Sequence, residues 1–195
     1  MNFKDYQLAS LKHLTTCKSM LGCMNSLTNG TSTIVNTNGK NAALLHNLFY
    51  LSGYTIECIV NYSILKHYKW PDSDSVYVTN HKFSNKCQVA FYENTQRMVN
   101  MAAVSGVYTF YFSGHNFQRN IQVLQKIFSS SKIPLIDKTV VVDKDLMNLY
   151  TNWKVEIRYN PQSTNYSSVA LSVDNVTRFV NLTETVYNSL MKLVG

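Results

Sequence analysis

The chain has 195 residues, of which 45% are apolar and 15% charged, and its formal net charge is +7. General disorder is excluded because it requires low hydrophobicity together with high net charge, and the length suffices for one domain with a buried core. No apolar run reaches the roughly 18 residues of a membrane-spanning helix, and the first residues lack the layout of a signal peptide. We therefore expect a cytoplasmic protein without membrane contact.

Common chemical motifs are absent from the sequence. The seven glycines are scattered, so no phosphate-cradling loop is formed, and no GxSxG elbow occurs. The histidines have no mutual spacing that suits a metal. The cysteines form no CxxC pair and are expected to be reduced thiols (Cys17, Cys23, Cys58 and Cys87). The sequence thus predicts no metal and no cofactor.

The basic balance, with a pI near 9.2, favours an anionic partner such as nucleic acid. No segment carries a run of Lys or Arg, however, and the charge is spread thinly along the chain. A solvated basic surface without a dedicated partner explains the same composition.

Apolar periodicity predicts two helices in the first third of the chain. The first spans about 3–24, with Leu8, Leu11, Leu14 and Leu21 at near-helical spacing, and a small polar loop is expected over 25–38. The second spans about 39–68 and carries a broad apolar stripe. Gly53 lies in its middle, where glycine costs about 1 kcal/mol relative to alanine. We expect a neighbouring helix to pack closely against it.

Residues 72–113 are interpreted as an irregular insert. Ser75–Val78 and Val107–Phe112 alternate and are rich in Val, Tyr and Phe, which suits short strands or aromatic-rich turns. Between them, the apolar residues predict a helix with one buried face (Cys87, Phe91, Met98, Met101 and Ala102).

The remaining residues predict further helices. One begins at Gly114, and Asp143 caps a short one that extends to Tyr150. Residues 153–159 alternate and are expected to be extended, with Trp153 and Tyr159 on the buried side. A last helix is expected over about 166–193. The predicted fold class is therefore mainly all-α. We expect a single domain over 1–195, built as an up-and-down bundle of four to five long helices. The irregular insert in this bundle can contain strands.

Two polar groups are candidates for function. Glu57 follows Gly53 by one turn in a very apolar helix, so its carboxylate belongs either to a polar site or to a structural ion pair, with Arg158 or a group near His115 as partner. Arg158 precedes Tyr159 and Asn160 at the expected start of the last helix, where its planar fork suits phosphate. A salt bridge to Glu57 or Glu156 that fastens the extended segment explains the arginine equally well.

Three ordered segments together resemble prokaryotic HEPN-domain proteins. They are Leu44–Lys66 with its Gly53-Tyr54-x-x-Glu57-Cys58 core, Gly114-His115-Asn116-Phe117, and Trp153 followed by Arg158-Tyr159. The resemblance covers about 40–195, with 72–113 as an insert. It gives Gly53, Tyr54 and Trp153 structural roles.

The resemblance implies a dimeric helical bundle of bacterial or archaeal cytoplasm, linked to RNA cleavage, toxin–antitoxin modules or phage defence, with nucleotide binding in some members. Ribonuclease members carry an arginine, four to six residues and then a histidine. No arginine here has a histidine at that distance (Arg97, Arg119, Arg158 and Arg178). Loss of the activity explains this better than replacement by a distant histidine such as His115.

The sequence therefore predicts a homodimeric protein that binds RNA or a nucleotide. Arg158 would hold phosphate, Tyr159 and Asn160 would lie beside it, and Glu57 and His115 would support the site. Two alternatives are a metal-independent endoribonuclease that uses Arg158 and His115, and a non-catalytic interaction module, such as a partner of an antitoxin, that docks through Tyr108–Phe112.

Overall fold

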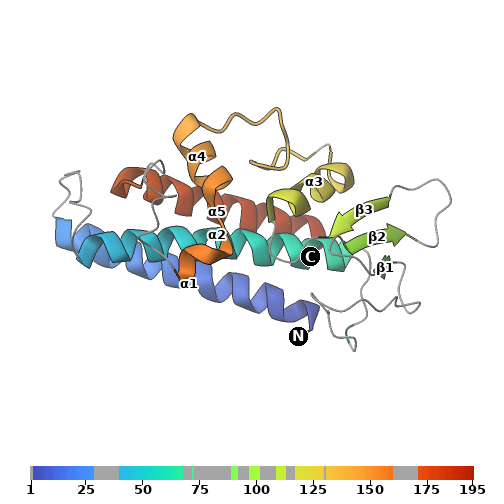
Figure 1. Ribbon diagram of the computed structural model, residues 1–195, viewed down its shortest axis with the longest axis horizontal. Coiled ribbons are helices and arrows are strands. Elements are labelled where there is room, and N and C mark those ends of the chain that lie inside the picture. The colour runs from blue at the N-terminus through green and yellow to red at the C-terminus, as the bar shows by residue number, and fades with distance from the viewer. Residues whose placement is uncertain are drawn as a thin grey trace.

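The computed structural model describes residues 2–28, 40–67, 72, 89–91, 97–101, 109–112, 117–129, 131–159 and 171–195. Three long helices dominate it, namely α1 (Phe3–Thr28), α2 (Lys40–His67) and α5 (Val173–Val194) (Figure 1). Two shorter helices, α3 (Phe117–Ile127) and α4 (Lys144–Asn152), and a 3₁₀ turn, η1 (Val155–Arg158), pack around them. The predicted mainly α-helical bundle is confirmed.

Helix α2 is the central element and packs against α1, α3, α5 and η1. It runs antiparallel to α1, as the stacking of Phe3 on Tyr62 at one end shows, with 5.7 Å between the ring centroids. The rings of Phe49 and Phe179 lie 5.8 Å apart between α2 and α5. A helix surrounded on all sides has no solvent face, which explains why apolar residues occur around much of α2.

Helices α1 and α5 also run antiparallel to each other. Lys18 forms an ion pair of 2.6 Å with Glu184, while Gln7, nearer the start of α1, contacts Met191 near the end of α5. Consequently α2 and α5 run parallel to each other. Both chain termini lie at the same end of the bundle (Figure 1).

Side-chain caps fix where several helices begin. In α1 the Asn2 side chain accepts a hydrogen bond from the backbone of Lys4, and the Asp5 carboxylate accepts one from the backbone of Asn2. This reciprocal pattern satisfies two amides of the first turn. Asp143 caps α4 as predicted and accepts a bond of 2.9 Å from the Leu146 amide. Ser172 caps α5 in the same way.

Polar side chains inside α2 are satisfied locally or by one partner across the interface. Ser52 and Ser63 donate to backbone carbonyls one turn earlier, each at 2.7 Å. Asn61 accepts a hydrogen bond of 2.8 Å from Asn120 of α3, and both side chains are fully buried. This pair fixes the position of α3 on α2, since either amide alone would be costly to bury.

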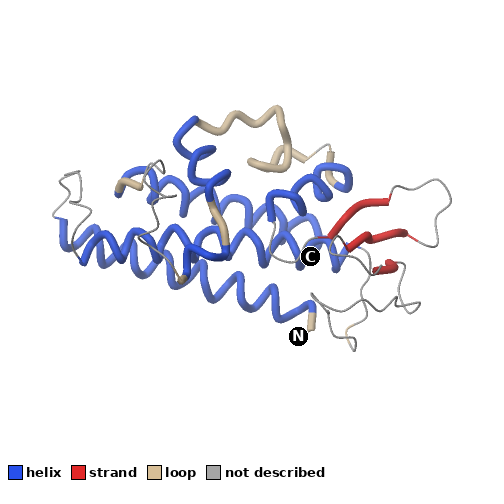
Figure 2. The backbone as a smooth tube through the Cα atoms, viewed as in Figure 1, coloured by secondary structure: helices blue, strands red, loops and turns tan. Residues whose placement is uncertain are grey.

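The insert contains a small antiparallel sheet in the order β1-β2-β3, at the end of the bundle where both termini lie (Figure 2). Its strands are β1 (Val89–Phe91), β2 (Arg97–Met101) and β3 (Thr109–Phe112). Val89 pairs with Met101, and Arg97 pairs with Phe112. The strand predicted at 107–112 is confirmed over 109–112, whereas that at 75–78 lies outside the described residues.

The helix predicted between those strands is wrong. Its apolar residues fit one helical face, but three of them, Phe91, Met98 and Met101, lie in the paired strands β1 and β2. The third strand, rich in Phe and Tyr, provides the pairing surface that the helical interpretation omitted.

Three further boundaries differ from the prediction. Residues 25–28 continue α1 instead of starting the loop. Residues 155–158 form a 3₁₀ turn instead of an extended segment, so Trp153 and Ile157 are buried while Tyr159 is 72% exposed. Helix α5 begins at Val173 because Ser172 caps it there, about seven residues later than expected. On α1, Leu14 is buried as expected, but Leu8 is exposed.

Candidate functional site

The close contact expected at Gly53 comes from a tryptophan and not from a neighbouring helix. A Cβ atom placed on Gly53 would lie 2.2 Å from both Cδ1 and Nε1 of Trp153. Real Cβ contacts do not come so near, so the glycine leaves the space that the indole ring fills. Trp153 itself is 1% exposed.

Three hydrogen bonds hold the Trp153 segment in place. The indole Nε1 donates to the Tyr50 carbonyl of α2 at 3.0 Å. Gln118 of α3 donates to the backbone carbonyls of both Tyr150 and Trp153, each at 3.0 Å. The end of α4 and the start of η1 are therefore fixed to α2 and α3 at once.

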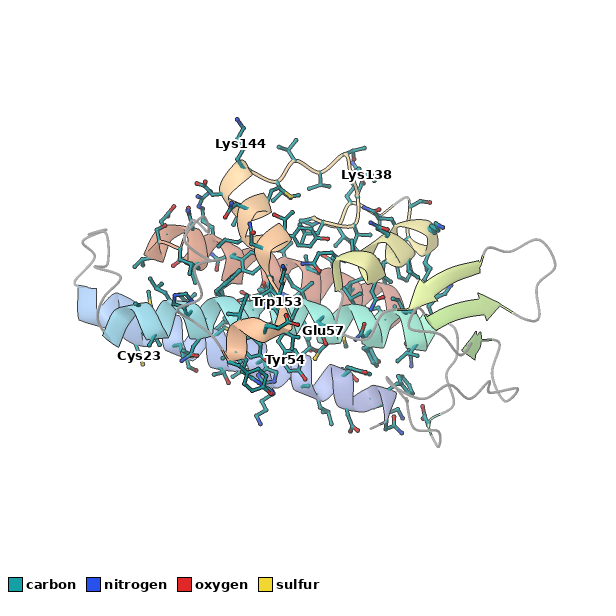
Figure 3. The ribbon with its side chains drawn as sticks, in the orientation of Figure 1. Cys23, Tyr54, Glu57, Lys138, Lys144 and Trp153 are labelled. Atoms are coloured by element: carbon teal, nitrogen blue, oxygen red, sulfur yellow. The ribbon has the colours of Figure 1, made fainter. Side chains whose placement is uncertain are left out.

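A row of aromatic rings extends from this contact along α2, and two of its members, Trp153 and Tyr54, are labelled in Figure 3. Tyr50 lies between Trp153 and Tyr54, with centroid separations of 6.2 and 5.9 Å and nearly parallel planes. His13 of α1 contacts Tyr54 at 4.9 Å. Burial is the main cause that lowers the pKa of His13 and raises the pKa of Tyr54. The rings are therefore neutral at physiological pH.

Glu57 lies on the same face of α2 and is 1% exposed. Burial raises the pKa of the neighbouring Cys58 thiol, and the charge of Glu57 raises it further. The same charge contributes to the raised pKa of Tyr54. Among the described residues no ion pair joins Glu57 to Arg158. The carboxylate thus belongs to the interior of the bundle, whereas the guanidinium belongs to its surface.

Arg158 ends η1 and lies beside two tyrosines. Its guanidinium carbon is 4.3 Å from the centroid of the Tyr159 ring, which is itself largely exposed. Burial raises the pKa of Tyr50, while the charge and hydrogen bonding of Arg158 act in the opposite direction. The exposed guanidinium of Arg158, the exposed ring of Tyr159 and the phenolic hydroxyl of Tyr50 therefore lie close together.

Two predicted site residues, His115 and Asn160, lie outside the described residues. Within the described ranges, no group of three or more His, Cys, Asp or Glu side chains could hold a metal ion. Tyr50 and His13 were missed by the sequence analysis. Tyr50 could have been found, because positions 50, 53, 54 and 57 of a helix lie on one face.

A large cleft beside η1 could not be predicted from the sequence. The cleft measures about 1250 Å³ and lies between α3, residues 135–142, α4 and residues 153–156. Three glutamines one turn apart on α3 line one wall (Gln118, Gln122 and Gln125). Trp153 lines the cleft and also covers Gly53, so it connects the cleft to the aromatic row on α2.

In the part of the chain that the structure describes, no helix is long and apolar enough to cross a membrane. Compared with family models, with curated proteins and with solved structures, the chain matches none of them.

Proposed function

We propose that this protein binds single-stranded RNA or a nucleotide at a surface formed by Arg158 and Tyr159, next to the largely buried Tyr50, without cleaving it. The observation that carries the proposal is the exposed guanidinium stacked over the exposed Tyr159 ring. Arginine binds phosphate through its planar fork, and exposed aromatic rings stack on unpaired bases. The two groups together match the two chemical parts of a nucleotide.

The position of the pair supports this function. Arg158 is anchored on a 3₁₀ turn that Trp153 fixes to α2, so the guanidinium is presented by a packed segment. The net charge of +7 favours an anionic partner over the whole surface. The resemblance to HEPN-domain proteins, linked to RNA, toxin–antitoxin modules and phage defence in the cytoplasm of prokaryotes, agrees with this ligand class.

A salt titration with a labelled single-stranded RNA tests the proposal. Binding should weaken steeply with salt, because phosphate contacts release counterions. Arg158→Ala should weaken binding and flatten the salt slope, and Tyr159→Ala should weaken binding by about 1–3 kcal/mol with little change in slope. Lys18→Ala is the matched control, since it removes one exposed positive charge from α1. Equal losses in Arg158→Ala and Lys18→Ala would contradict a dedicated site.

Cleavage is the second candidate activity and is measured in the same experiment. Incubation of labelled RNA with the protein in EDTA, beside Arg158→Ala and His115→Ala, distinguishes the two. Cleavage that vanishes in both variants would replace the binding proposal with a metal-independent endoribonuclease. Intact RNA in all samples supports binding alone.

We propose in addition that two copies associate through the outer face of α1. Leu8 and Leu11 are 64% and 48% exposed there, which is unusual for large aliphatic side chains on one helix face. Light scattering should show a dimer that Leu8→Lys converts to a monomer. A monomer at all concentrations would contradict it.

A further inference from the structure

Two arginines, Arg178 of α5 and Arg158 of η1, are held by partners of opposite kinds. The Arg178 guanidinium forms ion pairs with three carboxylates (Asp143, Asp145 and Asp174). Within the described ranges, no ion pair joins Arg158 to a carboxylate. It lies instead against two neutral groups, the hydroxyl of Tyr50 and the ring of Tyr159. The charge of Arg178 therefore serves the contact between α4 and α5, whereas that of Arg158 is available to an anion.

The hydroxyl of Tyr50 is held in one position by the packing of its ring. Tyr50 is 8% exposed. Its ring lies between those of Trp153 and Tyr54, with interplanar angles of 18° and 10°. Its carbonyl also accepts the hydrogen bond of 3.0 Å from the Trp153 indole, so the segment that carries Arg158 is fixed to the same residue. The ring cannot turn away from η1 without breaking both stacks.

The Tyr50 phenol holds the guanidinium without neutralising it. Burial raises the pKa of Tyr50, although the nearby charge of Arg158 acts in the opposite direction, so the hydroxyl is protonated at physiological pH. The guanidinium donates one N–H to the hydroxyl oxygen and keeps its other donors for a ligand. A carboxylate in the place of this phenol would instead compete with phosphate for the positive charge.

The contact with Tyr159 complements this hydrogen bond. The guanidinium carbon of Arg158 lies 4.3 Å from the centroid of the Tyr159 ring, which is a cation–π contact. The ring supports one face of the guanidinium, and the Tyr50 hydroxyl restrains its edge. An unrestrained arginine side chain occupies many rotamers, and ordering it opposes binding. Two contacts that order the side chain in advance reduce this cost.

We propose that the Tyr50 hydroxyl is a positioning group that orients the Arg158 guanidinium before RNA binds, so that its fork meets a phosphate without being reordered. The inference rests on the function proposed for the Arg158 surface, and it names the residue that preorganises that surface. Tyr50 does not contact the RNA itself and acts through Arg158.

A double-mutant cycle with the labelled single-stranded RNA tests this role. Tyr50→Phe removes the hydroxyl and keeps the stacked ring, and it should weaken binding about threefold to tenfold. In an Arg158→Ala background the same change should alter the affinity by less than about twofold, because the group that it positions is gone. Tyr54→Phe is the matched control, since it removes a hydroxyl from the neighbouring ring of the same row and should leave the affinity unchanged.

NMR of the arginine side chains measures the orientation in the free protein. The guanidinium signals of Arg158 are identified by their absence from Arg158→Lys. An ordered guanidinium rotates slowly about its Cζ–Nη bonds and gives separate signals for its terminal protons. These signals should be separate in the wild type and in Tyr54→Phe, and they should merge in Tyr50→Phe, while circular dichroism shows an unchanged fold.

The outcomes distinguish this inference from the proposed function. If Tyr50→Phe binds RNA as tightly as the wild type while Arg158→Ala binds weakly, the positioning role is overturned and the proposed function stands. Equal losses from Tyr50→Phe with and without Arg158 also overturn it, because the hydroxyl then acts independently of the guanidinium. If Arg158→Ala binds RNA normally, the proposed function and this inference both fail. Should Tyr50→Phe not fold, separate Arg158 signals in the wild type support the inference, and merged signals overturn it.

Discussion

Gly53→Ala is the substitution whose consequence the structure defines most sharply. In an ordinary helix interior the change to alanine stabilises by about 1 kcal/mol. Here the new methyl group would lie 2.2 Å from two indole atoms of Trp153, so the ring must move by more than about 1 Å to reach van der Waals contact. The ring cannot move freely, because its Nε1 donates a hydrogen bond to the Tyr50 carbonyl. The backbone carbonyl of Trp153 also accepts a hydrogen bond from Gln118.

The expected net effect is destabilising. Overpacking of a filled core costs about 1–3 kcal/mol, and loss of the buried indole hydrogen bond costs a similar amount. After the gain in helix propensity is subtracted, we expect a loss of about 3 kcal/mol in the free energy of unfolding. For a chain of this size that corresponds to a fall in Tm of about 6–12 °C.

Urea and thermal unfolding followed by circular dichroism measure this change. Gly22→Ala is the matched control, because Gly22 lies inside α1 and nothing occupies the space around its Cβ position. That variant should be stabilised by about 0.5–1 kcal/mol. In a Trp153→Ala background, Gly53→Ala should also become stabilising. If Gly53→Ala is as stable as Gly22→Ala, or if its cost persists without the indole, the packing explanation is refuted.

Three further outcomes are expected. Iodoacetamide should alkylate the exposed Cys23 in the folded protein long before it alkylates Cys17, because burial raises the pKa of the Cys17 thiol to about 11. Peptide mass mapping measures both alkylation rates, and equal rates would contradict this expectation. Asn120→Leu should destabilise by about 1–3 kcal/mol, because it leaves the Asn61 amide without its cross-helix donor, and urea unfolding checks it. Burial lowers the pKa of His13, so its neutral form is favoured in the folded state. The contribution of the neutral His13 to the free energy of unfolding is complete above pH 6.5 and is lost as the pH falls through the lowered pKa of His13. In His13→Phe, the midpoint of urea unfolding should therefore decrease less as the pH is lowered.

The long helices could be predicted because their apolar spacing persists over several turns. Asp143 was identified as a cap from its residue type alone, and the structure confirms the bond to the Leu146 amide. The insert could not be predicted in the same way. A short apolar segment fits a helical face and a strand face equally well, and only its pairing with β3 decides between them.

The prediction of an extended segment over 153–159 was wrong for a related reason. Its alternation of apolar and charged residues predicts an extended chain, and the structure does expose Lys154, Glu156 and Arg158. The 3₁₀ turn over 155–158 breaks the alternation after Trp153, so Trp153 and Ile157 are buried while Tyr159 is exposed. This difference matters for function, since an inward Tyr159 could not stack on a base.

The cleft was invisible in the sequence because its walls come from segments far apart in the chain. Its glutamines are ordinary residues for the outer face of a helix, and only the return of residues 135–142 across α3 turns that face into a wall. Trp153 was identified from a motif, but its second role, as a lining residue of the cleft, depends on the turn that follows α4. One side chain therefore fills the space above Gly53, fixes the turn that presents Arg158 and lines the cleft. A shift of the Trp153 indole should consequently disturb both the cleft and the surface that presents Arg158.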